Sequence, residues 1–148
     1  MKVEIGPYPS EDSIFTEQQI SVHIDPWDTW SMDHTLANII LPMLKQLKET
    51  RHGSPIVDDE DVPEHLPKQQ WSSSQSSQYD LFASKETDEM IWCAMHARWA
   101  WVMNEMLWAF ETMTSDDWWE GLQYDRDTHE RVQRGTTLFG KYYRGLWD

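Results

Sequence analysis

The sequence predicts an α+β fold that is mostly helical, with a small N-terminal β-hairpin packed on about three helices. Two observations predict this class. Apolar residues alternate with polar ones near the N-terminus, and they recur every three or four positions in three later segments. The chain has 148 residues, the usual size of one domain, so we expect residues 1–148 to form a single domain with its own core.

The hairpin is predicted from two short alternating runs. Val3 and Ile5 alternate with charged residues before a Gly-Pro break. Ile20, Val22 and Ile24 alternate with polar residues before a proline, which predicts a half-buried strand. Because two strands alone are marginally stable, we expect them to pack on the helices.

Three segments with helical periodicity are predicted helices: residues 31–52, 86–113 and 127–146. Pro42 lies inside the apolar stripe of the first segment, where it should kink or divide the helix. The second segment is apolar on nearly all sides, which is typical of a central helix or of one shared with a partner. Gly135 and Gly140 weaken the third by roughly 1 kcal/mol each relative to Ala, or allow close approach to another backbone.

The segments between the helices carry weaker patterns. Residues 67–85 are predicted to form a flexible Ser/Gln-rich loop within the domain. Residues 115–120 are predicted to form a short helix or an ordered loop. Cys93, the only cysteine, lies in an apolar run, so we expect a buried and inert thiol and exclude both a disulfide and a Cys-rich zinc site.

The composition is strongly acidic: 26 Asp and Glu face 12 Lys and Arg, for a formal net charge of −14. This charge argues against direct binding of DNA or RNA and against anionic membranes. It is compatible with basic protein partners, with a nucleic-acid mimic, or simply with solubility. No apolar run is long enough to span a membrane, and the first residues lack the apolar stretch of a signal peptide, so we expect an intracellular protein.

Ten Trp residues exceed what a small core needs, and Trp is enriched among interface anchors. The second predicted helix also carries more apolar surface than a three-helix core can cover. We therefore expect a homodimer with this helix near the interface. The interface candidates are Trp92, Trp99, Trp101 and Trp108. The alternative is that all ten Trp residues are core or scattered rim residues.

Two histidines flank an acidic run and suggest a site for a divalent metal ion, the one cofactor that the sequence indicates. The candidate ligands are His52, Asp58, Asp59, Glu60, Asp61 and His65. The run lacks the spacing of an EF-hand, and a solvated charged loop is the alternative.

Two further groups of polar residues are candidates for function. Four are expected to be buried, with Glu105 paired to Arg98: His34, His96, Arg98 and Glu105. The last helix is basic and aromatic, and five of its residues are candidates for gripping a phosphate or another ligand: Arg131, Arg134, Lys141, Tyr142 and Arg144. The alternative for the second group is that these cations neutralise the acidic body of the protein.

Several segments resemble a family of small proteins encoded by tailed bacteriophages. They are DPWDTWSMDHTLA at 25–37, HGSP at 52–55, DEDVP at 59–63 and LFGKYY at 138–143. The resemblance covers most of the chain except the Ser/Gln tract. It implies a viral protein made in a bacterial cytoplasm and brings no activity or catalytic residues.

The sequence contains no phosphate-binding loop, no nucleophile elbow and no HExxH motif, so an enzyme is not the favoured interpretation. We expect a non-enzymatic phage accessory protein in the host cytoplasm that binds a host or viral protein, for example as an inhibitor of a host enzyme or defence system. Two alternatives stay open. One is a divalent-metal-dependent helical nucleotide-binding protein or phosphohydrolase, and the other is a minor virion component.

Overall fold

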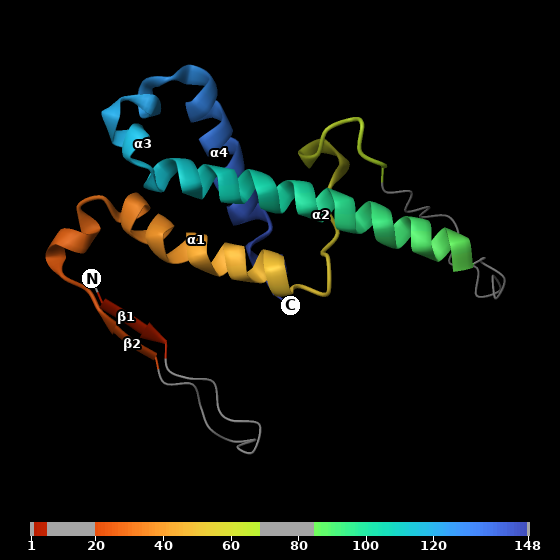
Figure 1. Cartoon of the computed structure of the whole chain (residues 1–148), viewed down its shortest axis with the longest axis horizontal. Coiled ribbons are helices and arrows are strands. Elements are labelled where there is room, and N and C mark those ends of the chain that lie inside the picture. Colours follow the sequence, from red (N-terminus) through yellow and green to blue (C-terminus); the bar gives the residue numbers. More distant parts are fainter. Residues whose placement is uncertain (1, 6–19, 69–84, 148) are drawn as a thin grey trace, which may run out of the picture. The chain divides into compact units, whose positions relative to one another are not determined.

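The computed structural model describes residues 2–5, 20–68 and 85–147. The chain divides into two compact units, residues 1–36 and residues 37–148. The described part is mostly helical and contains a two-stranded antiparallel hairpin, which confirms the predicted α+β, mostly α class (Figure 1). The Ser/Gln tract, and with it most of the predicted flexible loop, lies outside the described residues.

The hairpin forms the first unit together with the turn that follows it. Strand β1 (Lys2–Ile5) pairs antiparallel with β2 (Ile20–His23), in a register that places Val3 opposite Val22. Both predicted strands are therefore confirmed. The prediction of a half-buried second strand was wrong, because Ile20 is 63% exposed and Val22 55%. A 3₁₀ turn, η1 (Pro26–Thr29), follows β2.

All three predicted helices are present, as α1 (Met32–Thr50), α2 (Lys85–Thr114) and α4 (Arg126–Lys141). Pro42 lies inside α1 without dividing it. Four short elements join the set: η2 (Asp59–Asp61), α3 (Asp116–Glu120), η3 (Leu122–Tyr124) and η4 (Tyr143–Gly145). Helix α4 ends five residues earlier than predicted, because the backbone leaves the helical conformation at Tyr142 and turns through η4.

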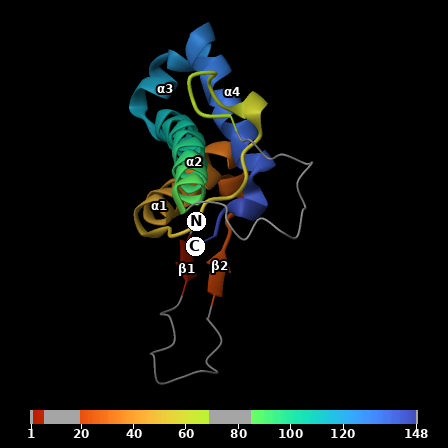
Figure 2. The same ribbon diagram turned by 90° about the vertical axis from the view of Figure 1, so that its right-hand side faces the viewer.

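The core of the second unit lies around the C-terminal half of α2. In Figure 2, which looks nearly along α2, α1 and α4 lie on different sides of it. The predicted apolar stripe is buried at four positions: Trp99, Val102, Met106 and Phe110. From α1 the buried residues are Ala37 and Leu44, while Met43 is 58% exposed.

Gly135 brings α4 and α2 into close contact. A Cβ atom built on Gly135 lies 2.5 Å from the Ala109 Cβ and 2.5 Å from the Glu105 carbonyl oxygen, far inside normal contact. Only glycine therefore allows this helix crossing. Gly140, on the same helix, is exposed and has no described atom within 4 Å of such a Cβ.

The N-terminal half of α2 extends beyond α1 and α4 (Figure 1). Its apolar side chains are correspondingly exposed, with Met90 at 66%, Ile91 at 42% and Trp92 at 53%. Cys93 is exposed as well, so the prediction of a buried thiol was wrong. The apolar run around Cys93 is exposed because this part of the helix has no helical neighbour among the described residues of its own unit.

Candidate functional site

Two stacked indole rings stand on the turn after β2. Asp25 caps η1 by accepting a hydrogen bond from the Trp27 amide at 3.0 Å, and Asp28 accepts one from the Asp25 amide at 2.8 Å. This reciprocal capping box, with proline at the first helical position, is a strong local signal for a fixed turn. The turn holds the rings of Trp27 and Trp30 stacked, with their centroids 5.6 Å apart and their planes at 27°.

These two rings are among the most exposed large side chains of the described residues. Trp27 is 74% exposed and Trp30 80%. The surroundings are acidic, because residues 20–36 contain Asp25, Asp28 and Asp33 but no Lys or Arg. The hydrogen bond from the Asp25 amide lowers the pKa of Asp28 and so favours its ionised form.

A charged cluster joins α2 to α4. Glu105, 5% exposed, accepts hydrogen bonds from Arg131 at 2.7 Å and from Arg134 Nε at 3.0 Å. Burial opposes ionisation of Glu105, but the hydrogen bonds from Arg131 and Arg134 outweigh it, and the pKa is lowered. The Arg131 guanidinium also lies over the Trp108 ring, 4.0 Å from its centroid, and Arg134 lies 6.0 Å from that of Trp101.

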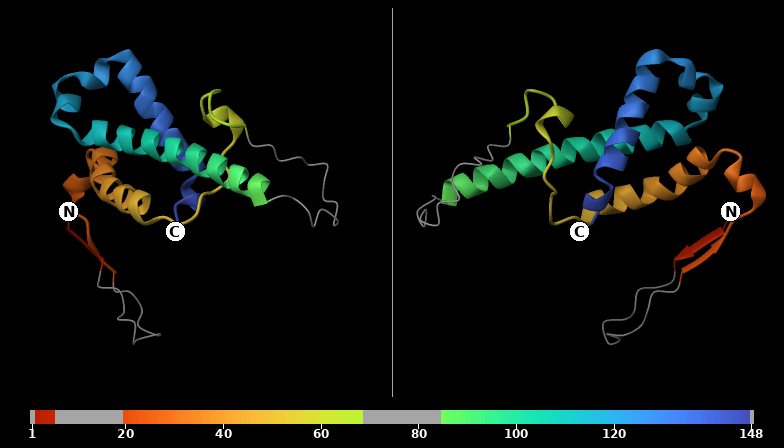
Figure 3. Two further views of the ribbon diagram at one scale, coloured as in Figure 1. Left: turned by 45° about the vertical axis from the view of Figure 1, so that its right-hand side comes forward. Right: turned by 180° about the vertical axis from the view of Figure 1, so that it is seen from behind.

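The predicted partner of Glu105 was therefore wrong. Arg98 and Glu105 are both buried, as predicted, but they belong to different contacts, because they are seven positions apart on α2 and meet different segments. Arg98 forms an ion pair with Asp59 at 2.7 Å and donates to the Val57 and Pro67 carbonyl oxygens. Figure 3 shows α4 crossing α2.

The acidic run is held by the end of α4. Lys141 forms ion pairs with Asp58 at 2.8 Å and with Asp61 at 2.6 Å, and a longer one with Glu60 at 3.4 Å. Tyr142 donates to Asp61 and accepts from the Asp58 amide at 2.9 Å. Burial and the hydrogen bond to Asp61 raise the pKa of Tyr142 to about 12. The carboxylates of the run thus have protein cations as partners.

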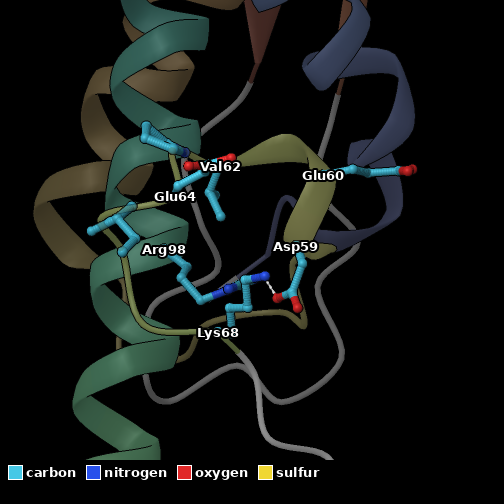
Figure 4. Close-up of a pocket in the computed structure, with 8 residues that line it drawn as sticks. Asp59, Glu60, Val62, Glu64, Lys68 and Arg98 are labelled. Atoms are coloured by element: carbon cyan, nitrogen blue, oxygen red, sulfur yellow. Dashed lines mark ion pairs between the residues drawn. The ribbon is translucent and has the colours of Figure 1, made fainter.

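A shallow pocket of about 330 Å³ lies beside this run. Figure 4 shows Asp59 and Arg98 paired within it, with Glu64 and Lys68 also at its lining. The buried Nε of Arg98 has no hydrogen-bond partner in the described part of the chain. The pocket is mixed in charge, and its one buried cation is already paired.

The predicted metal ligands do not converge. Within the described ranges, no three His, Cys, Asp or Glu side chains are placed to hold a metal ion. His52 and His65 are exposed, and the carboxylates between them face Lys141 and Arg98. The acidic run thus joins the segment after α1 to the end of α4.

His34 and His96, the other two polar residues that were predicted to be buried, are half-buried. The Nδ1 of His96 lies 2.8 Å from the Ser54 hydroxyl and 3.4 Å from Arg51, and the ring packs edge-on against Trp92. These contacts tie α2 to the segment that follows α1. His34 lies in the first turn of α1.

The predicted ligand-binding and interface residues have mixed positions. Of the five cations and aromatics proposed for a ligand, Arg131, Arg134, Lys141 and Tyr142 contact carboxylates, while Arg144 is exposed. Of the four interface candidates, Trp92 is exposed, and Trp101 and Trp108 are partly buried beneath arginines. Trp99 is 1% exposed, so its placement at an interface was wrong: it packs edge-on against Tyr142 in the core.

Sequence reasoning missed Trp27 and Trp30 as candidate site residues. The signal was present in the sequence, because Asp-Pro-x-Asp places a cap, a first-turn proline and a reciprocal carboxylate at the positions of a capping box. Such a turn fixes the backbone that carries the two indoles.

Comparison with known proteins adds no relative to this description. No helix among the described residues is both long and apolar enough to cross a membrane. No protein-family model, no curated protein and no solved structure matches the chain.

Proposed function

We propose that this protein is a non-enzymatic phage accessory protein that works in the host cytoplasm by binding a host or viral protein. The observation that carries the proposal is the stacked, exposed pair of Trp27 and Trp30 on its capped turn. Large exposed indoles in a fixed conformation are typical of interface anchors, because they bury much area at a small loss of conformational entropy.

The charge of the protein supports a basic partner. With a formal charge of −14, the chain attracts cationic protein surfaces and repels nucleic acid. An inhibitor of a host enzyme or defence system that acts on nucleic acid fits this chemistry, because such enzymes present basic surfaces to their substrates.

The ligand chemistry proposed for α4 has less support. Arg131 and Arg134 share Glu105, and Lys141 contacts Asp58 and Asp61. A phosphate would have to displace these carboxylates, one of which is buried. These contacts argue against the nucleotide-binding and phosphohydrolase alternatives.

Self-association is part of the proposal. Met90, Ile91 and Trp92 form an exposed apolar surface on the N-terminal half of α2. These three side chains are uncharged, so a second copy can cover them by apolar contact. Pairing of two α2 helices is the simplest arrangement that covers it.

The test of binding is a capture experiment with matched variants. The full-length protein is immobilised and exposed to bacterial host lysate at physiological salt, and any partner is identified, purified and titrated. We expect Trp27→Ala combined with Trp30→Ala to weaken binding by at least about 2 kcal/mol, roughly thirtyfold. Trp119→Ala is the control, because Trp119 is 51% exposed but lies on α3. Equal affinity for all three proteins would contradict the proposal.

A further inference from the structure

The turn that carries Trp27 and Trp30 is fixed by its own hydrogen bonds. Besides the capping box, the Thr29 hydroxyl donates to the Pro26 carbonyl at 2.9 Å, and the Trp30 amide donates to the Trp27 carbonyl at 3.2 Å. Proline restricts the backbone further at the first helical position. The two indoles are therefore carried on a backbone of defined geometry, and their rings stack on each other.

The chemistry of this surface selects for a cation. Each stacked indole turns one face to its neighbour, and the high exposure of both rings leaves the other faces accessible. An indole face is the best aromatic partner for a cation, and the turn that carries Trp27 and Trp30 also contains the carboxylates of Asp25 and Asp28. An anion would meet repulsion here, and a neutral ligand would gain nothing from the carboxylates.

The same chain already contains the combination of groups that we infer for the partner. At the contact of α2 and α4, Arg131 lies over Trp108 at 4.0 Å while its guanidinium binds Glu105 at 2.7 Å. This internal contact shows that one guanidinium can stack on an indole and pair with a carboxylate at the same time. The turn carries the same two kinds of group, indole and carboxylate, and residues 20–36 contain no arginine.

We propose that the Trp27–Trp30 turn recognises an arginine-bearing segment of the partner protein, with the guanidinium stacked on an exposed indole and paired with a carboxylate of the turn. Arginine is favoured over lysine because the planar guanidinium stacks on rings and sheds water more easily than an ammonium group. The inference rests on the proposed function and names the chemical class of its partner.

The test uses the full-length protein labelled with 5-fluorotryptophan and observed by fluorine NMR. The resonances of Trp27 and Trp30 are assigned with Trp27→Phe and Trp30→Phe, and that of Trp119 serves as the internal control. The probe is an acetylated glycine-rich peptide with two arginines, and the matched probes carry citrulline or lysine at the same positions. Citrulline keeps the shape of arginine but has no charge.

We expect the arginine peptide to shift the resonances of Trp27 and Trp30 saturably, with little effect on Trp119. The lysine peptide should bind more weakly than the arginine peptide. Loss of one indole should lower the affinity for the arginine peptide roughly two- to fivefold. Equal shifts from the citrulline or the lysine peptide would overturn the assignment of arginine, while the capture experiment could still succeed. Shifts that depend on protein concentration without peptide would make a second copy the occupant, and no shift with any peptide would also overturn the inference.

Discussion

Substitution of Gly135 by alanine tests the packing that holds the second unit together. The added methyl group would lie 2.5 Å from both the Ala109 Cβ and the Glu105 carbonyl oxygen, where ordinary contact begins at 3.4 Å. The helices would have to separate by about 0.9 Å, the difference between these two distances. One of the opposing atoms belongs to the backbone of α2, so a rotamer change cannot relieve the contact.

The magnitude follows from two opposing effects. Overpacking of this kind destabilises a core by about 1–3 kcal/mol, and the backbone contact places Gly135→Ala near the upper end. Replacing glycine by alanine inside a helix stabilises it by about 0.5–1 kcal/mol. We therefore expect a net loss of about 2 kcal/mol in the free energy of unfolding.

Gly140→Ala provides the matched control, because it lies on the same helix and its added methyl meets no described atom within 4 Å. We expect it to stabilise the protein by about 0.5–1 kcal/mol. Guanidinium unfolding followed by circular dichroism measures both variants, and unchanged slopes keep the comparison valid. If Gly135→Ala proves as stable as Gly140→Ala, the close approach of α2 and α4 is refuted.

Three further substitutions test other contacts. Glu105→Gln should destabilise the protein by about 1–3 kcal/mol at neutral pH. Because the pKa of Glu105 is lowered on folding, its contribution to stability is present above pH 4.5 and is lost as the pH falls further. The difference in the free energy of unfolding between the variant and the wild type should therefore be smaller in acid than at neutral pH. Tyr142, with its pKa raised to about 12, stabilises the fold below pH 10 and loses this contribution between pH 10 and 12. Tyr142→Phe should flatten that alkaline loss in unfolding curves, and an unchanged profile would contradict the role of its hydroxyl. Sedimentation at micromolar concentration should show a dimer that Trp92→Glu converts to a monomer and the equally exposed Trp119→Glu does not. A wild-type monomer would contradict self-association.

The positions of the helices were predictable because their apolar periodicity is strong. The choice of partners was not, as Glu105 illustrates. Periodicity places Glu105 and Arg98 on the same helix, but it does not show which face of another helix will oppose them. The register of α2 against α4 is set by Gly135, and this register brings Arg131 and Arg134 to Glu105. Gly135 follows Arg131 and Arg134 and lies within an otherwise apolar stripe. Sequence reasoning gave this combination too little weight.

The exposure of Cys93 has a different cause. Its apolar neighbours predict burial, but burial needs a neighbouring element of sufficient length. At 1.5 Å per residue the 30 residues of α2 extend about 45 Å, whereas the 19 residues of α1 extend only about 28 Å. Helix lengths were available from the sequence, so the uncovered end of α2 was predictable from them.

The acidic run shows the limit of composition as a guide to chemistry. Asp58 and Asp61 have the residue types of a metal site, but their role depends on what the fold brings to them. The end of α4 supplies Lys141 and Tyr142, which lie eighty or more positions away in the sequence. No local pattern encodes such a long-range contact.

The most direct test of the binding surface is the accessibility of Trp27 and Trp30 with and without the purified partner. Photochemically induced nuclear polarisation enhances the signals of Trp rings only where a dye in solution can reach them. We predict strong enhancement of both rings in the free protein and its loss in the complex, while Trp119 keeps its enhancement. If the Trp27 and Trp30 signals show no enhancement in the free protein, or keep their full enhancement in the complex, these rings are not the anchor.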